Sequence, residues 1–254
     1  MAPIRSAPLE VTGHRSDLGR WRAAQRAADR RLRDYVLGYF ASEGFLPKPL
    51  DERHVPSLGV ALVLNFAAPH RIIDPADPKR TTEHTSAWFV ALQHRHQLRE
   101  AFGARDFMVV RFSPIGAQML LQTPMDLLTD CILALEEIDR PFARLLTAHA
   151  EAAHHWAARF DIVEKIIAER LESAANPPSA LLRSWRILQE SPNHLGVATL
   201  EQRSRRRGIS GLGPDRCGIA SSDQNLLTSR WLEVGRWPQP FVRSSACRSV
   251  PFDL

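Results

Sequence analysis

The chain has 254 residues, of which 44% are hydrophobic and 24% are charged, and it carries a net charge of +5. This composition is that of an ordinary globular protein and excludes a chain that is disordered throughout. The three cysteines, at positions 131, 217 and 247, have no spacing that suits a metal site or a disulfide framework. No apolar run reaches the about 20 residues of a membrane span, so the sequence predicts a cytoplasmic protein without membrane contacts.

Basic residues are concentrated at the two ends of the chain. Residues 1–34 contain eight arginines against four acidic residues, and residues 201–254 contain nine against five. The segment between these ends is mildly acidic. Basic ends can contact nucleic acid, because arginine supplies much of the sequence-independent affinity for phosphates. The alternative is a pair of solvated, disordered tails.

Residues 1–34 are predicted to be a basic N-terminal tail that contains a short helix. Within residues 16–34, apolar side chains recur at helical spacing, at Trp21, Ala24, Ala28 and Leu32. Such an arginine-rich helix could pack on the neighbouring domain, or it could lie on DNA or on a membrane surface.

Residues 35–130 are predicted to form a β-rich sensor or dimerisation domain. Short apolar runs rich in strand-forming residues lie at 35–41, 59–67, 71–74, 86–92 and 106–112. Turn-forming segments separate them, near 47–58, 74–84 and 96–106. Several short strands at this spacing are typical of a small antiparallel sandwich or barrel.

Helical spacing begins at Ser113, which can cap a helix whose first residue is Pro114. Further helices are predicted at 124–130, 140–157 and 159–174. Residues 131–175 are therefore predicted to be a helical connector. Two prolines at 177 and 178 end this part, since a helix cannot continue through them.

Residues 176–200 are predicted to begin a helix-turn-helix. The segment "ALLRSWRILQE" places leucines and Trp185 along one helical face, and "VATLEQ" starts a second helix at Val197. Beyond residue 200, apolar spacing fades into arginine, glycine, serine and proline.

The segments "DYVLGYFASEG", "LGVALVLNF" and "SAWFVALQHRHQLRE" resemble the N-terminal domain of a subset of AraC-type bacterial transcription regulators. A strand followed by Ser/Thr-Pro-x-Gly-Ala is a landmark of that subset, matched here by Ser113, Pro114, Gly116 and Ala117. The resemblance implies a β-rich domain followed by two DNA-binding helix-turn-helix units. The predicted fold class is therefore α+β: a small, cupin-like antiparallel β sandwich or barrel, then helices and an incomplete helix-turn-helix.

The resemblance ends after Leu200. The Gly-x-Ser turn that the family pattern requires stands at Gly208 and Ser210, three residues too late. The recognition helix that should follow would contain two glycines and a proline in its first turns, and these residues disfavour a helix. Residues 201–254 are therefore predicted to be a divergent, disordered tail. The 30 arginines against three lysines indicate a gene rich in G and C. A shifted reading frame of such a gene tends to give Arg, Gly, Ser, Pro, Cys and Trp, so we hypothesise a frameshift near codon 200. A native divergent tail is the rival explanation.

One segment, "HRHQLRE", contains a weak metal-binding pattern. His94 and His96 would alternate onto one face of a strand, with Glu100 four residues beyond, as the ligands of cupin metal sites do. The glycine that normally precedes such a motif is Trp88 here, which favours surface histidines. Neither a metal nor another cofactor is predicted.

The segment "RSRRR" contains the candidate DNA contacts, Arg203, Arg205, Arg206 and Arg207. These side chains could neutralise phosphates, but base readout needs an ordered element in a groove, and none is predicted there. The alternative is a solvated basic run.

The leading prediction is an AraC-like transcriptional regulator, and not an enzyme, with an intact sensor half and a defective DNA-binding half. Its expected partners are DNA, bound weakly or not at all, a second copy of the chain, and an unidentified small-molecule effector. The alternative is a non-DNA-binding sensor or dimerisation module that interacts with a related regulator. A metal-dependent cupin enzyme is a third hypothesis.

Overall fold

In the computed structural model, the described residues are 7–190, without positions 55, 58, 74–78, 80 and 95. They divide into two compact units, one ending at Ala174 and one starting at Ala175. The first unit contains all the described strands, and the second contains helix α5 (Ser179–Glu190). The predicted second helix of the helix-turn-helix, at Val197, lies outside the described residues.

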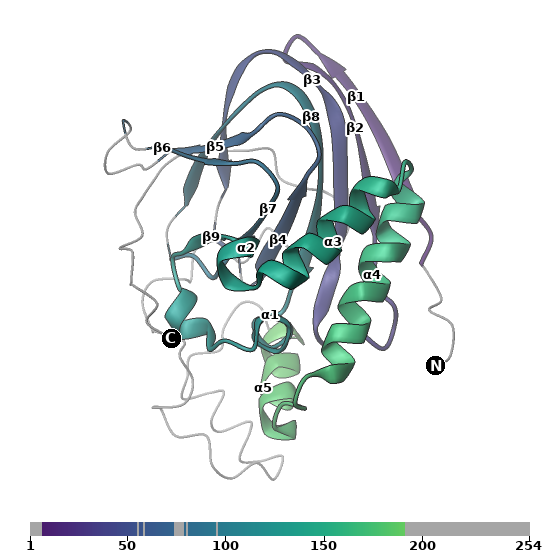
Figure 1. Ribbon diagram of the computed structural model, residues 1–254, viewed down its shortest axis with the longest axis vertical. Helices are drawn as coiled ribbons and strands as arrows, with labels where there is room; N and C mark the ends of the chain where they lie inside the picture. Colours follow the sequence, from purple (N-terminus) through teal and green to yellow (C-terminus); the bar gives the residue numbers. More distant parts are fainter. Residues whose placement is uncertain are drawn as a thin grey trace. The chain divides into compact units, whose positions relative to one another are not determined.

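The first unit is built on a curled antiparallel sheet (Figure 1). Its strands are β1 (Glu10–Ser16), β2 (Gly19–Arg26), β3 (Val36–His54), β4 (Val60–Asn65), β5 (His70–Ile73), β6 (Thr81–His84), β7 (Ala87–Val90), β8 (Gln97–Phe112) and β9 (Ile132–Ala134). Their order is β1-β2-β3-β8-β4-β7-β9, and β5 and β6 form a side branch on β8. The predicted antiparallel, β-rich architecture is therefore confirmed.

The two long strands, β3 and β8, pair with each other over most of their lengths. The C-terminal half of β8 also pairs with β4, and its N-terminal part pairs with β5. The register of β3 shifts once in its middle: Leu46 lies opposite Gly103, but Leu50 lies opposite Ala101. Three residues of β3 thus face one residue of β8 at this bulge.

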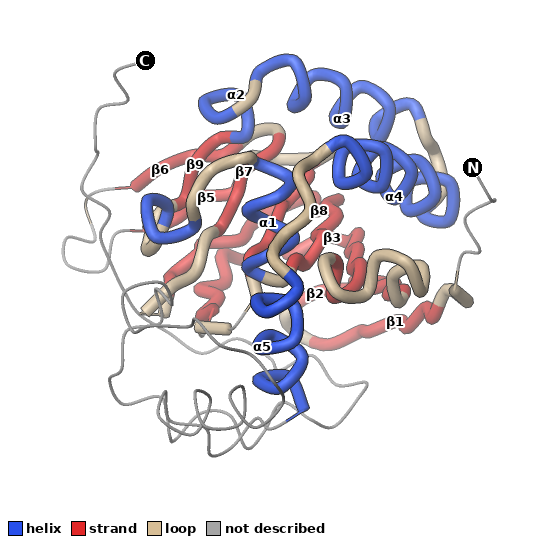
Figure 2. Tube along the Cα trace, turned by 90° about the horizontal axis from the view of Figure 1, so that it is seen from below, coloured by secondary structure: helices blue, strands red, loops and turns tan. Residues whose placement is uncertain are grey.

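The helices follow the sheet in the chain. They are α1 (Pro114–Leu121), the 3-10 helix η1 (Met125–Leu128), α2 (Leu135–Ile138), α3 (Arg140–Ala152), α4 (Trp156–Ser173) and α5. Figure 2 shows α3 and α4 lying side by side. The predicted helix over 140–157 is shorter than expected, because the backbone is extended at Ala153 and His155 and a new helix begins at Trp156. No helix in the described ranges is long and apolar enough to cross a membrane.

One face of the sheet forms the main core. Alternate residues of β8, Met108, Val110 and Phe112, are completely buried, as expected for one face of a strand. The ring of Tyr39 in β3 lies 5.9 Å from the ring of Phe160 in α4. Helix α4 therefore packs on this face of the sheet.

The predicted helix within residues 16–34 is wrong, because strand β2 occupies residues 19–26 and pairs with β1 and β3. Its exposed residues Arg20 and Arg22 share one face with the buried Ala24 and Arg26. Arg26 is buried because it ion-pairs with Asp161 and Glu164 of α4. A buried arginine breaks the apolar alternation that identifies a strand from sequence.

All three segments predicted as turns contain strand residues. Residues 47–54 continue β3, residues 97–106 continue β8, and residues 81–84 form β6. Pro47 and Pro49 indicated a turn, yet both lie at the β3 bulge, where a strand tolerates proline. Glu52 and Arg99 lie directly opposite each other across the two strands and both are buried, so the polarity of these two positions does not mean exposure to solvent.

Helix α1 confirms the predicted N-terminus. Ser113 Oγ accepts a hydrogen bond from the Gly116 backbone N–H at 3.0 Å and donates one to the Asp34 carbonyl at 2.8 Å. The Ser113 backbone N–H donates to the Tyr35 carbonyl at 2.8 Å. The cap thus ties the start of α1 to the chain that enters β3.

Replacing Gly116 with alanine should destabilise the protein by about 2 kcal/mol, the typical cost of overpacking. A Cβ atom at this position would lie 2.2 Å from the Tyr35 carbonyl oxygen and 2.7 Å from its carbon. This backbone cannot move away without losing the hydrogen bond from Ser113. Urea denaturation measures the effect, and Gly13→Ala is the control, because a Cβ there meets nothing within 4 Å. Equal stabilities of the two variants would contradict the prediction.

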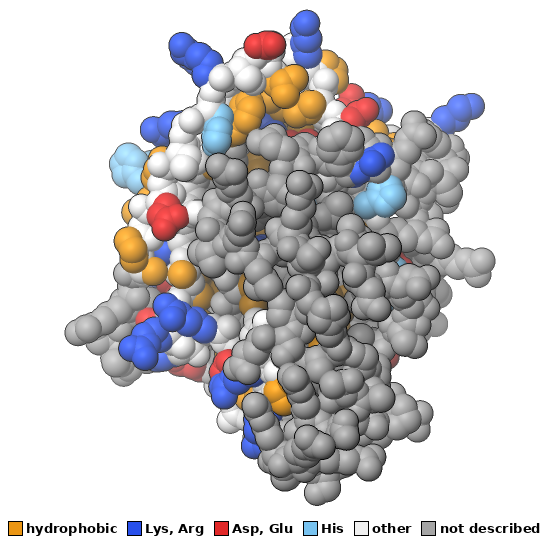
Figure 3. Space-filling view, turned by 180° about the vertical axis from the view of Figure 1, so that it is seen from behind, with side chains coloured by type: hydrophobic (Ala, Val, Ile, Leu, Met, Phe, Trp, Pro, Cys, Tyr) orange, Lys and Arg blue, Asp and Glu red, His pale blue; other side chains and the backbone are white. Residues whose placement is uncertain are grey.

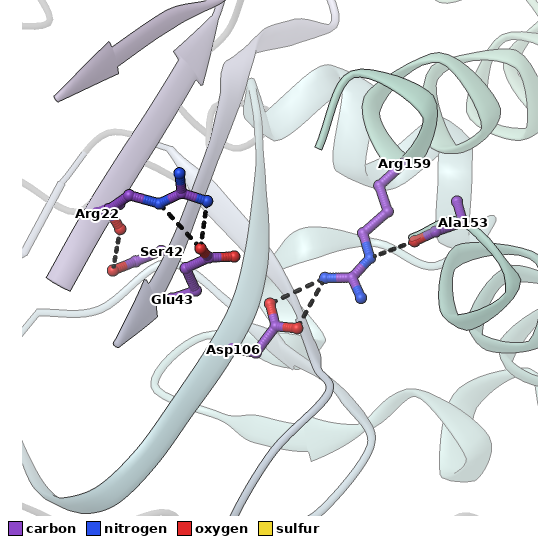
Figure 4. Close-up of polar contacts among 6 residues, drawn as sticks. All are labelled: Arg22, Ser42, Glu43, Asp106, Ala153 and Arg159. Carbon is purple, nitrogen blue, oxygen red and sulfur yellow. Dashed lines mark hydrogen bonds and ion pairs between the residues drawn. The ribbon is translucent and has the colours of Figure 1, made fainter. Parts of the chain in front are cut away.

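Two arginines attach α4 to the sheet. Arg159 donates from Nη1 to both carboxylate oxygens of Asp106 in β8, at 2.8 and 2.9 Å, and from Nε to the Ala153 carbonyl at 2.8 Å (Figure 4). Arg26 of β2 donates from Nη2 to Glu164 of α4 at 3.0 Å. The position of α4 therefore depends on charged contacts as well as on apolar packing.

Candidate functional site

The strongest candidate site is a group of ionisable side chains on the face of the sheet opposite the main core. We call Glu52, His54, His70, Arg99 and Arg105 the inner cluster. Glu52 and His54 alternate along β3, and Arg99 and Arg105 occupy alternate positions of β8, so the members of each pair share a face. The register places Glu52 directly opposite Arg99.

Glu52 is the centre of the inner cluster, and only 8% of its side chain is exposed. Arg105 Nη1 lies 2.6 Å from Glu52 Oε1, and Arg99 Nε donates to Oε2 at 2.9 Å. Arg99 Nη2 makes a second, short contact with the same oxygen. His54 Nε2 lies 3.6 Å from Oε2. One carboxylate therefore holds two guanidinium groups in place.

The surroundings control the charge of each group. Burial alone would raise the pKa of Glu52, but Arg99, His54 and Arg105 together hold that pKa well below its usual range. Burial and the charge of Arg99 lower the pKa of His54. Burial, together with the charges of Arg99 and Arg105, lowers the pKa of His70 to about 2. At neutral pH the cluster therefore has a charged glutamate, two charged arginines and neutral histidines.

Aromatic rings line the inner cluster. The ring of His70 lies 5.1 Å from that of Trp88 in β7 and 5.4 Å from that of Phe107 in β8. The guanidinium carbons of Arg99 and Arg105 lie 5.5 and 5.2 Å from the centre of the Phe107 ring. These distances are those of cation–π contacts, so Phe107 supports both arginines.

The weak metal pattern is not assembled as the sequence suggested. His94 and His96 lie before β8 and not on a strand, because β8 begins at Gln97. Asp130 accepts a hydrogen bond from the His94 backbone and lies 3.1 Å from its ring Nδ1. Glu100 ion-pairs with Arg71 at 2.8 Å. Within the described part of the chain, no three His, Cys, Asp or Glu side chains are grouped so that they could hold a metal ion.

The candidate DNA contacts Arg203, Arg205, Arg206 and Arg207 lie outside the described residues. On the face drawn in Figure 3, the coloured Lys and Arg side chains lie at several separate places.

Sequence reasoning missed the inner cluster. Its charged residues stand in segments that contain proline, glycine and several charges, which are typical of turns. One available signal was the alternation of Glu52 with His54 and of Arg99 with Ala101, Gly103, Arg105 and Phe107. Period-two spacing of opposite charges in two segments is compatible with paired strands.

No known family model matches the chain, and no curated protein matches it. Several solved structures show a distant likeness, among them the following three. The AraC-like transcriptional activator CuxR is 13% identical, with 80% of this chain and 76% of that chain covered and a TM-score of 0.36. FeII HppE is 9% identical, with 41% of this chain and 56% of that chain covered and a TM-score of 0.32. A cupin 2 conserved barrel domain protein from Rhodopseudomonas palustris is 11% identical, with 41% of this chain and 71% of that chain covered and a TM-score of 0.29. The matched part thus spans about half the length of HppE. Likenesses of this size assign neither a family nor an activity.

The prediction that the chain is not an enzyme is corrected by the same comparison. Oxalate decarboxylase of Bacillus subtilis is among the similar structures, at 14% identity and a TM-score of 0.29, together with HppE. Similar structures therefore include enzymes as well as a transcriptional activator. They do not supply an activity for this chain.

Proposed function

We propose that the chain is an AraC-like transcriptional regulator whose β-rich unit is the sensor. The observation that carries the proposal is the inner cluster, a group of ionisable and aromatic side chains in which Glu52, His70 and Arg99 are buried. Buried charges that packing alone does not require are typical of binding sites. The resemblance of the landmark at Ser113 to that of AraC-type regulators supports the same function.

Helix α5 supports the proposal that a DNA-binding half starts in the second unit. Helix α5 follows two prolines and keeps Trp185 and Ile187 buried. Residues 176–200 remain the proposed start of a helix-turn-helix, 35–130 the proposed sensor or dimerisation domain and 131–175 the proposed connector. Arg203, Arg205, Arg206 and Arg207 are proposed to contact phosphates. A second copy of the chain and a small-molecule effector are the other proposed partners.

A gel-shift assay over a salt series tests DNA binding. The probes are the DNA upstream of the chain's own gene and an unrelated fragment of equal length. Four phosphate contacts alone would weaken binding about fiftyfold between about 50 and about 150 mM salt. A regulator is expected to retain a preference of about tenfold or more for its own fragment at about 150 mM. Replacing the four arginines by glutamine should weaken binding to both fragments.

Binding that is equal for the two fragments and disappears with salt would contradict DNA recognition. That result would favour the second candidate, a dimerisation or sensor module that interacts with a related regulator. The break in the family pattern at Gly208 favours this candidate. Co-expression with a full-length AraC-type regulator, followed by size-exclusion chromatography, would then detect a mixed dimer.

A further inference from the structure

Positive charge exceeds negative charge in the inner cluster. Arg99 and Arg105 both contact Glu52, the one carboxylate among its described members. His70 adds no charge at neutral pH, because burial lowers its pKa to about 2. The pKa of the half-exposed His54 is also lowered, so His54 adds little charge there. The exposed fractions of the Arg99 and Arg105 side chains are 11% and 13%. One buried positive charge therefore lacks a counter-charge among these residues, and such a charge is costly.

Several buried polar atoms in and beside the inner cluster also lack a hydrogen-bond partner among the described residues. Arg105 Nε, His70 Nδ1, His84 Nε2 and Gln97 Nε2 are buried and have no hydrogen-bond partner among the described residues. His84 lies opposite His70 across β5 and β6, and Gln97 lies opposite His54 across β3 and β8. About 90% or more of buried polar groups in proteins are paired, so several unpaired ones together indicate an absent acceptor. Arg105 Nε can only donate, which requires that the absent group accept.

We propose that the inner cluster binds the oxyanion group of a small molecule, a carboxylate or a phosphate, through Arg99 and Arg105. This inference rests on the proposed sensor function and names the chemical class of its ligand. A guanidinium group presents its N–H donors in a planar fork that matches two oxygens of such an anion. Glu52 holds the two forks in place and leaves Arg105 Nε free for the ligand.

The neighbouring side chains determine what else the ligand carries. Val63, Trp88 and Phe107 are buried together, and the half-buried Phe40 and Val109 pack against them. An apolar or aromatic body attached to the oxyanion would contact these side chains and the His70 ring. Two arginines beside neutral histidines repel cations, so this site does not suit a metal ion or an amine.

Isothermal titration calorimetry on the purified full-length chain tests the proposal. The probes are inorganic phosphate and benzoate, each compared with sodium chloride at equal ionic strength. The chain is expected to bind at least one of these oxyanions and not chloride. Binding of phosphate alone assigns a phosphate-bearing ligand, and binding of benzoate alone assigns a carboxylate-bearing one. No binding of either oxyanion overturns the proposal.

Three variants test the role of the cluster. Arg105→Gln removes the extra charge and the unpaired donor, and should weaken binding about tenfold or more. Arg105→Lys retains the charge without the fork and should bind with intermediate affinity. Glu52→Gln removes the competing carboxylate and should tighten binding, a gain that misfolding cannot produce.

Arg71→Gln is the matched control, because Arg71 lies on β5 with its side chain on the opposite face, paired with Glu100. Its affinity for the oxyanion should equal that of the unmodified chain. Equal affinities of the Arg105→Gln and Arg71→Gln variants would overturn the assignment of the site. No DNA is present in this assay, so its failure is distinguishable from a failure of DNA recognition in the gel-shift assay.

Discussion

Replacing Glu164 with leucine is expected to destabilise the protein by about 3–5 kcal/mol, the usual cost of removing one partner from a buried ion pair. The Glu164 side chain is completely buried in α4. Its Oε2 accepts from Arg26 Nη2 at 3.0 Å, and its Oε1 accepts from the Asp29 backbone N–H at 2.8 Å. Leucine would fill the space but would leave both donors without this acceptor.

The remaining contacts of Arg26 cannot replace Glu164. Arg26 Nη1 lies 2.5 Å from Asp161 Oδ1, but the Asp161 side chain is 56% exposed, so water weakens this pair. The guanidinium also lies over the rings of Tyr39 and Phe160, at 5.7 and 5.3 Å, and these rings supply no hydrogen-bond acceptor. The variant therefore keeps a charge buried between the sheet and α4.

Urea denaturation of the two proteins measures this effect, and Lys165→Ala is the control on the same helix. Lys165 is exposed and lies 3.9 Å from Glu169, and such surface pairs contribute at most about 1 kcal/mol. If Glu164→Leu and Lys165→Ala lower the free energy of unfolding equally, the buried pair is not needed to hold α4.

The second large effect is a loss of stability in acid. The pKa of His70 is about 2 in the folded chain and ordinarily 6.5, so below 6.5 the unfolded chain binds a proton that the folded chain excludes. Each pH unit below that value then lowers the free energy of unfolding by about 1.4 kcal/mol, or about 3 kcal/mol at about pH 4.5. Above pH 6.5 neither state binds this proton, so His70 causes no loss of stability there.

Most charged groups that face His70 also oppose its protonation. Arg99 and Arg105 of β8 and His54 of β3 lower its pKa, and Glu52 of β3 raises it. The pKa values of His54 and His84 are also lowered by burial, so both histidines add to the loss below pH 6.5. Because the pKa of Glu52 is depressed, its contribution is lost at still lower pH.

Urea denaturation at several pH values measures the slope. His70→Phe keeps an aromatic ring between Trp88 and Phe107 but cannot bind a proton, so its stability should fall less steeply in acid. His149→Phe is the control, because His149 is exposed on α3. A His70→Phe slope as steep as that of the unmodified chain would show that His70 does not cause the acid sensitivity.

The sequence allowed those parts of the fold to be predicted in which apolar periodicity determines the structure. Strands β4 and β7 lie within the predicted apolar runs, and α1 begins at the predicted cap. The structure also explains why the Ser/Thr-Pro-x-Gly-Ala landmark has a glycine at position 116: the side chain of any larger residue would collide with the Tyr35 backbone. Strands β1 and β2 were missed because charged residues interrupt their alternation, and the burial of Arg26 depends on a helix that is distant in sequence.

The inner cluster could not be predicted for a related reason. Glu52 and Arg99 are separated by 47 residues, and only the register of β3 with β8 brings them together. Sequence alone shows polar segments with turn residues at both places. The candidate residues that it did indicate, His94 and Glu100, are paired with Asp130 and Arg71 instead.

The β3 bulge restricts how the length of this chain can change. Because three residues of β3 face one residue of β8, β3 has two residues more than β8 at the bulge. Two is an even number, so side chains of β3 on either side of the bulge keep the same alternation between the two faces of the sheet. An insertion or deletion of one residue at 47–49 would turn Glu52 and His54 to the opposite face and separate Glu52 from both arginines. A change of two residues would preserve their direction. Length variation at this position should therefore be tolerated in steps of two, whatever the residues inserted.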